Sequence, residues 1–353
     1  MGGPRGLSPD EDEFTLAVTA LERAMDRSDR GTTPIEVDLL ADLPASMEWA
    51  LPAAVGAPVR LLRSAASSRG FVDALHRAGD GSGGMALVVA VQLPPAEGPP
   101  ERGGAASVAF LFGGSGRGDL SGRLDPLTDE GSAVRAAFAL YRSIRAERAG
   151  GTGFGTWAGD WDEADVPGPV PDGPDRMPVA ERATDLVSQG AYVPRPRYLE
   201  NLPSRWRFVA DRCAGCGNLT FPARGKCRAC GRTDGLAPTE LPRDGAGVVA
   251  TTVIGPGGQP TEFDPQVEAW GPYEVVLAEL APGVRVTLQL TDAVPGEVRI
   301  GDRVDTRLRR LFPIEGEWRY GRKAVPQAAR PAGAAGAFRP SEGGSHGAPT
   351  QLS

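Results

Sequence analysis

Histidine and cysteine are scarce in this sequence. His76 falls in a predicted helix and His346 in an alanine- and glycine-rich tail, and the chain has no other histidine. All four cysteines stand in two closely spaced pairs of a kind that binds metal, so no cysteine remains as a nucleophile. Without a free thiol or a well-placed imidazole, we do not expect a Cys–His or Ser–His–Asp mechanism.

Long apolar segments are also missing. The longest apolar runs, Met85–Val91 and Val108–Phe112, have the length of strands and are too short to cross a membrane. The N-terminus has no apolar core of the kind found in signal peptides. We therefore expect a soluble, cytoplasmic protein that does not bind membranes. In that reducing compartment, paired cysteines bind metal more readily than they form disulfides.

Positive charge is confined to part of the chain. The formal net charge is -7 at pH 7, which argues against a general nucleic-acid coat. Between Arg205 and Arg232, however, seven basic residues stand against one acid, Asp211, a local net charge of +6. The basic side chains of such a segment can bind the phosphate groups of a ligand.

The remaining composition indicates several domains. A chain of 353 residues is long enough for two or three hydrophobic cores. The 48 glycines and 33 prolines predict long connections around compact units rather than one continuous fold.

The first 150 residues alternate helical and strand patterns, which is typical of an α/β layer. Apolar residues recur at helical spacing from Phe14 to Met25, with Ser8 or Asp10 placed to cap the helix. Uninterrupted apolar strands predict a sheet that is covered on both faces. The predicted strands span residues 35–40, 59–62, 85–91 and 105–112, and the further helices span 46–55, 68–78 and 132–148.

The second half of the chain differs from the first in composition and in hydrophobic pattern. Residues 150–175 are rich in glycine, proline and acids without any period, so we interpret them as part of a linker. Short strands return at 248–254, 274–280, 284–291 and 303–312, and four or five such strands predict a small barrel of the OB type. The low complexity of residues 327–353 predicts disorder.

The most specific motif consists of two C-x2-C pairs, each followed directly by glycine. Each pair can turn two thiolates onto one ion, and the glycines let the backbone fold around the sulfurs. Four thiolates close a tetrahedron around Zn²⁺ and leave no position for water or substrate, so the metal would be structural and not catalytic. The proposed ligands are Cys213, Cys216, Cys227 and Cys230.

The zinc motif and the strands after it resemble the zinc-ribbon and OB-fold family that accompanies thiolases. The likeness runs from Arg212-Cys213 through Cys230-Gly231 into Glu274–Leu280, Glu297–Val304 and Arg309–Phe312. The resemblance implies a module that binds or shields acyl-CoA while docked on a thiolase-type enzyme. In that setting, we expect the CoA phosphates to be bound by Arg224, Lys226 and Arg228.

The N-terminal part is similar to the first half of the thiolase superfamily, especially its hydroxymethylglutaryl-CoA synthase and ketosynthase III branches. The likeness lies in segments 10–18, 65–75 and 87–113. In those enzymes a cysteine opens the helix where Ser67 stands here, and Arg69 is an extra residue. The second half of those enzymes has no counterpart before the linker. The resemblance implies a degenerate domain that keeps a dimerisation edge.

Together these observations predict a multi-domain protein: an α/β thiolase-like half domain followed by a rubredoxin-like zinc ribbon and an all-β OB-fold barrel. We expect a non-catalytic, zinc-binding accessory subunit that helps a thiolase- or hydroxymethylglutaryl-CoA synthase-like catalytic subunit to assemble and to bind acyl-CoA or an acyl carrier. Two alternatives stay open, an acyltransferase that uses Ser67 and an OB protein that binds single-stranded nucleic acid. The predicted boundaries are 1–149 for the half domain, 150–194 for the linker, 195–238 for the ribbon, 239–326 for the barrel and 327–353 for the tail.

Overall fold

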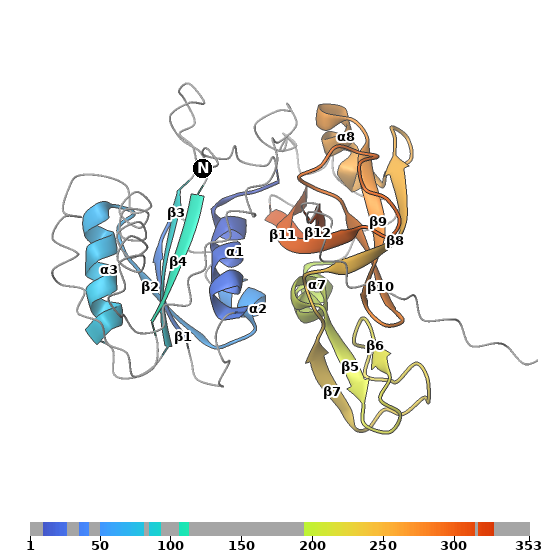
Figure 1. The fold of residues 1–353 in the computed structure, drawn as a ribbon, viewed down its shortest axis with the longest axis horizontal. Helices are drawn as coiled ribbons and strands as arrows, with labels where there is room; N and C mark the ends of the chain where they lie inside the picture. The colour runs from blue at the N-terminus through green and yellow to red at the C-terminus, as the bar shows by residue number, and fades with distance from the viewer. Residues whose placement is uncertain are drawn as a thin grey trace, which may run out of the picture.

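The computed structural model describes residues 10–26, 35–41, 50–80, 85–92, 106–112, 194–314 and 317–327. These residues form an N-terminal α/β unit and a C-terminal module rich in strands, which lie side by side in Figure 1. The predicted helix 132–148, the linker up to residue 193 and the tail from residue 328 lie outside the described residues.

A four-stranded sheet in the order β2-β1-β3-β4 forms the N-terminal unit. β1 runs parallel to both β2 and β3, whereas β4 is antiparallel to β3. The strands are β1 (Ile35–Leu40), β2 (Val59–Arg63), β3 (Met85–Gln92) and β4 (Ala106–Phe112). Each agrees with its predicted range to within one residue at either end, because uninterrupted apolar runs are a strong local signal.

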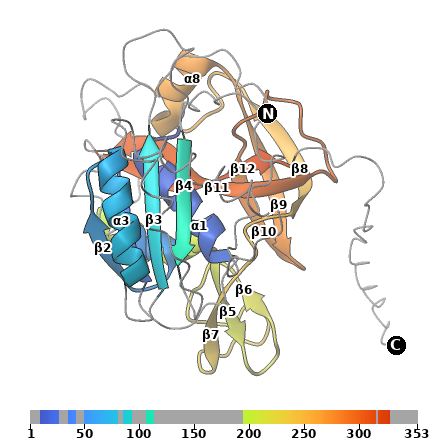
Figure 2. The same cartoon turned by 60° about the vertical axis from the view of Figure 1, so that its left-hand side comes forward.

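Helices cover both faces of this sheet, as predicted. They are α1 (Glu13–Asp26), α2 (Ala50–Val55) and α3 (Ser68–Asp80). α1 and α2 lie on one face and α3 on the other, which Figure 1 shows edge-on and Figure 2 from the side of α3. Leu87 and Val89 of β3 therefore pack in the α1 core, while the alternate residue Val88 is buried on the opposite face. Of the predicted helix 46–55, residues 46–49 lie outside the described residues.

The N-terminus of α1 corrects one prediction. Asp12, rather than Ser8 or Asp10, caps the helix: Asp12 Oδ1 accepts the Thr15 N–H at 2.9 Å, and Thr15 Oγ1 accepts the Asp12 N–H at 2.9 Å. Asp10 is buried instead, with Oδ2 2.8 Å from Nζ of Lys323 in the C-terminal module. Local spacing could not reveal this role, because the partner lies at the far end of the chain. Ser8 lies outside the described residues.

The C-terminal module begins with two short helices and a small ribbon sheet in the order β6-β5-β7. Its elements are α6 (Arg195–Glu200), α7 (Leu202–Arg207), β5 (Val209–Cys213), β6 (Leu219–Thr220) and β7 (Leu236–Glu240). The central strand β5 is antiparallel to both of its neighbours. The strands thus converge on the segment that holds the cysteines.

A five-stranded antiparallel sheet in the order β10-β9-β8-β11-β12 makes up the rest of the module. Its strands are β8 (Ala246–Ile254), β9 (Tyr273–Ala281), β10 (Val284–Gln289), β11 (Arg303–Ile314) and β12 (Glu317–Pro326). The two edges of the sheet meet, because Leu290 forms a parallel bridge to Ala324 of β12 and the Thr291 N–H donates to Ala324 O at 2.9 Å. Between β8 and β9 lie the 3-10 turn η6 (Thr261–Phe263) and the helix α8 (Asp264–Trp270).

The strand β12 and the helix α8 are absent from the sequence-based prediction. Charged side chains at buried positions, Arg319, Arg322 and Lys323, remove the apolar alternation that would have revealed β12. α8 has only seven residues and contains a proline, so its helical period is too short to recognise.

The two units share one hydrophobic core. The ring centroid of Phe14 in α1 is 4.9 Å from that of Tyr320 in β12 and 5.8 Å from that of Trp206 in α7. Leu308 of β11 and Leu87 of β3 belong to the same cluster of buried side chains. Nothing in the local sequence pattern indicates that Trp206 packs against the first helix.

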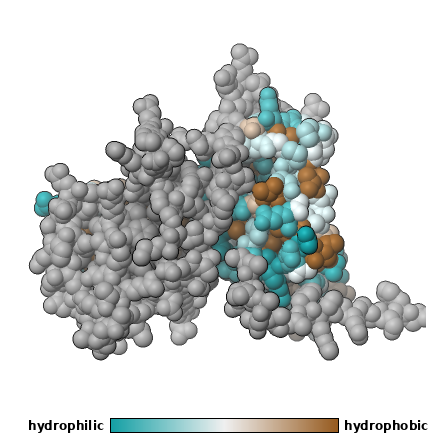
Figure 3. Space-filling model, turned by 45° about the horizontal axis from the view of Figure 1, so that its top comes forward, coloured by the Kyte–Doolittle hydropathy of each residue, from teal (hydrophilic) through white to brown (hydrophobic). Residues whose placement is uncertain are grey.

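The surface of the described residues has few large apolar side chains. Val253, Val294 and Ile300 are the ones that are exposed. On the face seen in Figure 3, apolar residues of the C-terminal module are interspersed with hydrophilic ones. Among the described helices, none has both the length and the hydropathy required to span a membrane.

Candidate metal centre

Two loops of the ribbon present the four cysteines. Cys213 is the last residue of β5 and Cys216 lies on the turn that follows it, whereas Cys227 and Cys230 lie between β6 and β7. The Gly217 N–H donates to the first cysteine's carbonyl oxygen at 2.8 Å, and the Gly231 N–H repeats this bond in the second loop at 3.0 Å. The φ angles of these glycines are +72° and +76°, in the left-handed region where a side chain is disfavoured. The glycine after each pair therefore completes the turn, as predicted.

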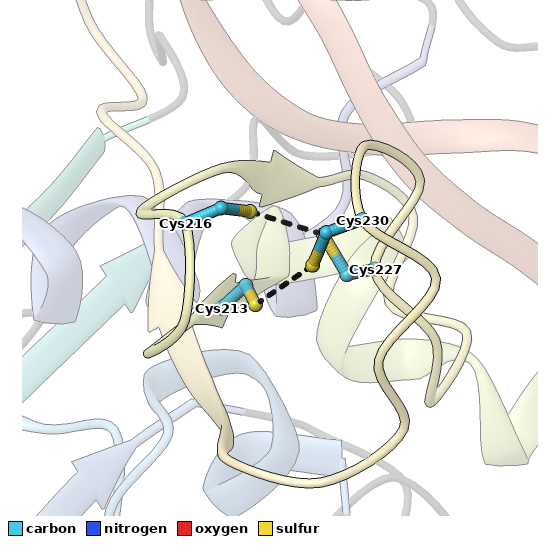
Figure 4. Close-up of side chains that lie close together, drawn as sticks. All are labelled: Cys213, Cys216, Cys227 and Cys230. Atoms are coloured by element: carbon cyan, nitrogen blue, oxygen red, sulfur yellow. Dashed lines mark hydrogen bonds between the residues drawn. The ribbon is translucent and has the colours of Figure 1, made fainter.

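The sulfur atoms are spaced for a tetrahedral ion. All four Sγ atoms lie within 4.8 Å of one another, and Figure 4 shows the side chains converging between the two loops. Cys213 Sγ is 3.6 Å from Cys230 Sγ, and Cys216 Sγ is 3.5 Å from Cys227 Sγ. A zinc ion with Zn–S bonds of about 2.3 Å holds its sulfurs about 3.8 Å apart. The residues thus fit one Zn²⁺, and in the described ranges they are the one group of three or more metal-ligating side chains.

Backbone hydrogen bonds lower the pKa of two of these thiols. The Cys230 N–H lowers the pKa of Cys227 to about 6 against the opposing effect of burial, and the Cys216 N–H likewise lowers the pKa of Cys213. The Asn218 N–H favours the thiolate of Cys216, but the thiols of Cys230 and Cys227 outweigh it and raise the pKa of Cys216 to about 12. Thiolates this close repel one another, so a bound cation is required before all four can be ionised.

Two polar residues to which the sequence pattern assigned no role hold the second loop. Oδ2 of Asp211 in β5 accepts the backbone N–H groups of Arg224 and Gly225 at 2.9 and 3.0 Å. Oγ1 of Thr220 in β6, which is fully buried, accepts the Arg228 N–H at 3.1 Å. The strands around the first cysteine pair therefore also fix the loop that carries the second pair. The sequence contains only a weak sign of the role of Asp211, namely an acid just before the first cysteine pair.

The second loop also carries the three basic residues expected to bind phosphate. Arg224, Lys226 and Arg228 are all exposed. Within the described residues their side chains make no hydrogen bond or ion pair, although the backbone N–H groups of Arg224 and Arg228 do. Arg232, by contrast, is paired with Asp234 at 2.7 Å. The loop therefore presents three unpaired positive charges to solvent.

Ser67 has a structural role in the described part of the chain. Its Oγ accepts the Gly70 N–H at 3.1 Å, which caps α3. No other hydrogen bond to this hydroxyl occurs among the described residues. His76 is exposed further along the same helix. Within the described ranges, no base is hydrogen-bonded to Ser67, as a serine nucleophile would require.

Comparison with known proteins agrees with the metal site. The model of the ChsH2 rubredoxin-like zinc ribbon domain matches residues 204–234, a range that contains all four cysteines. Three curated relatives are described as DUF35 domain-containing scaffold proteins. The one from Methanothermobacter thermautotrophicus is 34% identical over 134 residues, which are 37% of this chain and 95% of the relative.

The other two relatives match over a similar length. The protein of Methanocaldococcus jannaschii is 31% identical over 132 residues, 37% of this chain and 89% of the relative. The protein of Pyrococcus furiosus is 33% identical over 132 residues, 37% of this chain and 90% of the relative. A solved structure described as an Ltp2-ChsH2(DUF35) aldolase is 24% identical with a TM-score of 0.29, and the match covers 37% of this chain and 91% of that chain.

Proposed function

Because this chain belongs to the family of DUF35 domain-containing scaffold proteins, we propose that it is a non-catalytic, zinc-containing accessory subunit of an enzyme complex. We propose further that the complex acts on acyl-CoA or acyl-carrier substrates and that its catalytic subunit is of the thiolase or hydroxymethylglutaryl-CoA synthase type. The chain assembles with that subunit and helps it to bind the acyl group's carrier.

The observation that carries this proposal is a closed metal site in a module whose relatives are described as scaffolds. The four cysteines would supply all four ligands of a bound zinc ion and would leave it no position for a substrate oxygen or a reactive water. The role of such an ion is to hold the ribbon together. The accessory role is further supported by Ser67, whose hydroxyl caps a helix.

For the five-stranded sheet we propose an OB-type barrel. The support is its connectivity: β8, β9 and β10 form a meander, β11 returns beside β8, and β12 pairs with β11. The parallel bridge from Leu290 to Ala324 then joins the end of β10 to β12 and closes the sheet. For the N-terminal unit we propose a degenerate thiolase-type half domain, on the basis of the sequence resemblance and a mixed sheet covered on both faces.

The basic loop suggests how the subunit would contribute to substrate binding. Arg224, Lys226 and Arg228 are exposed and unpaired in the described part of the chain, so they are free to meet the phosphates of CoA. Since the loop is fixed by Asp211 and by the zinc ligands, these charges would be held in place before the ligand arrives.

Co-purification tests the proposal. The full chain is co-expressed with a thiolase-type enzyme from the same genome, and the complex is assayed with acetoacetyl-CoA beside each protein alone. We expect the two proteins to co-purify, the chain alone to show no turnover, and the complex to have a higher kcat/KM than the enzyme alone. Turnover by the isolated chain, or a failure to bind and to change the enzyme's kinetics, would contradict the proposal.

A further inference from the structure

One face of the C-terminal module is buried beneath the N-terminal α/β unit. The face is formed by α6, α7, β11 and β12, and we refer to it as the covered face. In Figure 1 the helices α1 and α2 stand between the four-stranded sheet and this face. α1 is therefore buried on two sides, by β3 on one and by the covered face on the other.

Charge complementarity across this boundary is extensive. Four carboxylates of the N-terminal unit meet five basic groups and one acid, Asp292, of the C-terminal module, so the formal charges cancel. The carboxylates belong to Asp10, Glu11, Asp12 and Glu22, and the basic groups to Arg243, Arg309, Arg310, Arg322 and Lys323.

Most of these groups are withdrawn from water. Arg309 Nη2 is 2.8 Å from Oε1 of Glu11, and the two side chains are 3% and 1% exposed. Arg322 is paired with Glu22, and those side chains are 1% and 8% exposed. Buried charges of this kind are tolerated only when their partners are present. The covered face therefore needs an acidic occupant.

An aromatic cluster fills the centre of the same boundary. Phe14 inserts between Trp206 and Tyr320, with ring centroids at 5.8 and 4.9 Å. The module holds its own two rings in place, because Trp206 Nε1 and the hydroxyl of Tyr198 both donate to Tyr320 O at 2.9 Å. A buried aromatic anchor surrounded by paired charges is the arrangement found in specific protein–protein interfaces.

Close backbone contact extends the boundary to α2. At Gly56, just after α2, an added Cβ would lie 2.1 Å from Nη1 of Arg207 in α7. The guanidinium of Arg207 thus lies directly on the glycine, and its Nη1 also donates to Glu240 of the ribbon at 2.5 Å. Any side chain at Gly56 would displace this contact.

We infer that the covered face is a protein-docking face of the ribbon and barrel, and that this chain fills it with its own N-terminal unit as a partner carried in cis. The relatives support the division of the chain into a module and a separate occupant. The match covers 95% of the Methanothermobacter protein but only 37% of this chain. The occupant is recognised as a run of carboxylates that leads into a helix with a buried aromatic residue. An external catalytic subunit would then bind elsewhere on the module.

A cleavage experiment on the full chain tests this inference. A site for a sequence-specific protease is inserted after Gly151, the purified protein is cut, and the products are followed by size-exclusion chromatography and by the dissociation constant of the two pieces. We expect the pieces to stay together as a 1:1 complex at nanomolar concentration. Separation after the cut, whether the pieces remain in solution or precipitate, would overturn the inference.

Matched variants keep the result interpretable. Gly56→Ala should weaken the complex of the cut pieces, whereas Gly283→Ala should not, because Gly283 has the same φ of +74° but no atom within 4 Å of its added Cβ. Glu22→Gln should weaken it about 100-fold, the effect of removing one partner from a buried charge pair. Glu36→Gln, at a partly exposed pair with Arg60, should leave it unchanged. Equal effects of the paired variants would count against the docking face. The measurement requires no external subunit. The inference about the covered face can therefore be refuted while the proposed accessory function stands.

Discussion

Glu22 and Arg322, which are 300 residues apart in the sequence, form a buried ion pair with Arg322 Nη1 3.0 Å from Glu22 Oε2. Arg243 Nη1 lies 2.7 Å from the other carboxylate oxygen. The first helix of the chain is thus bound to a strand near its end. Because these charges are buried, the contact between α1 and β12 depends on the ionisation of the Glu22 carboxyl group.

We predict that acid weakens the protein through Glu22. Burial alone would raise the pKa of this carboxyl, but Arg322 and Arg243 outweigh burial and lower it from the ordinary value of 4.5. Since the folded-state pKa is the lower one, the stabilisation is complete above pH 4.5 and is lost as the pH falls through the folded-state pKa. Urea unfolding at a series of pH values measures this.

The variant Glu22→Gln should cost about 3 to 5 kcal/mol of unfolding free energy at pH 7, because two buried arginines lose their counter-charge. Its deficit relative to the parent protein should shrink in acid. The surface variant Glu36→Gln should show neither effect. A constant deficit at every pH would mean that the ionisation of Glu22 is not the source of the stability.

We predict one tightly bound zinc ion per chain. Cys227→Ser should abolish zinc binding and unfold the ribbon, since a structural zinc site contributes on the order of 10 kcal/mol to folding. Metal analysis of the reduced protein and amide hydrogen exchange in β5, β6 and β7 are the measurements. Asp234→Asn, which changes an exposed pair with Arg232 in the same ribbon, should retain the metal. Fresh protein with far less than one zinc would refute the prediction.

Asp211→Ala should weaken zinc binding about 10- to 100-fold, the usual effect of losing a group that orients metal ligands. The reason is that the Asp211 carboxylate holds two backbone N–H groups of the second loop. Competition with a chromophoric chelator measures the affinity, with Asp234→Ala as the control. If both variants bind zinc equally well, the loop is held by the cysteines alone.

Ser67→Ala should leave the turnover of the complex unchanged while the unfolding free energy falls by about 1 kcal/mol, because the residue caps α3. Steady-state kinetics of the complex and urea unfolding of the isolated chain separate the two effects. If the substitution instead slows turnover by about two orders of magnitude or more, Ser67 is a nucleophile.

Charge reversal on the second loop should raise the KM of the complex for acyl-CoA. The triple variant Arg224→Glu, Lys226→Glu and Arg228→Glu places three carboxylates where we propose that phosphates bind. Assembly, measured by co-purification, should be retained. Arg299→Glu, at an exposed position of the C-terminal module, reverses one charge and serves as the control for the single variant Arg228→Glu, which makes the same change on the loop. An unchanged KM would exclude the loop as the phosphate site.

Local patterns in the sequence determined much of this protein. The spacing of the cysteines predicted that Cys213, Cys216, Cys227 and Cys230 lie together, because four thiols in two C-x2-C turns are a usual ligand set for one Zn²⁺. Apolar runs predicted all four strands of the N-terminal sheet and four of the five strands of the C-terminal sheet. In each case the information lies within a few neighbouring residues.

Only the tertiary structure decided how the units meet. Asp10 has the sequence position of a helix cap, and Arg322 and Lys323 have the character of surface residues, yet all three are buried at one boundary. Hydrophobic periodicity treats charged side chains as exposed, so it cannot reveal an ion pair whose partners enter the core together. The pairing of Glu22 with Arg322 depends on two chain segments that fold onto each other, and nothing in either segment alone specifies the other.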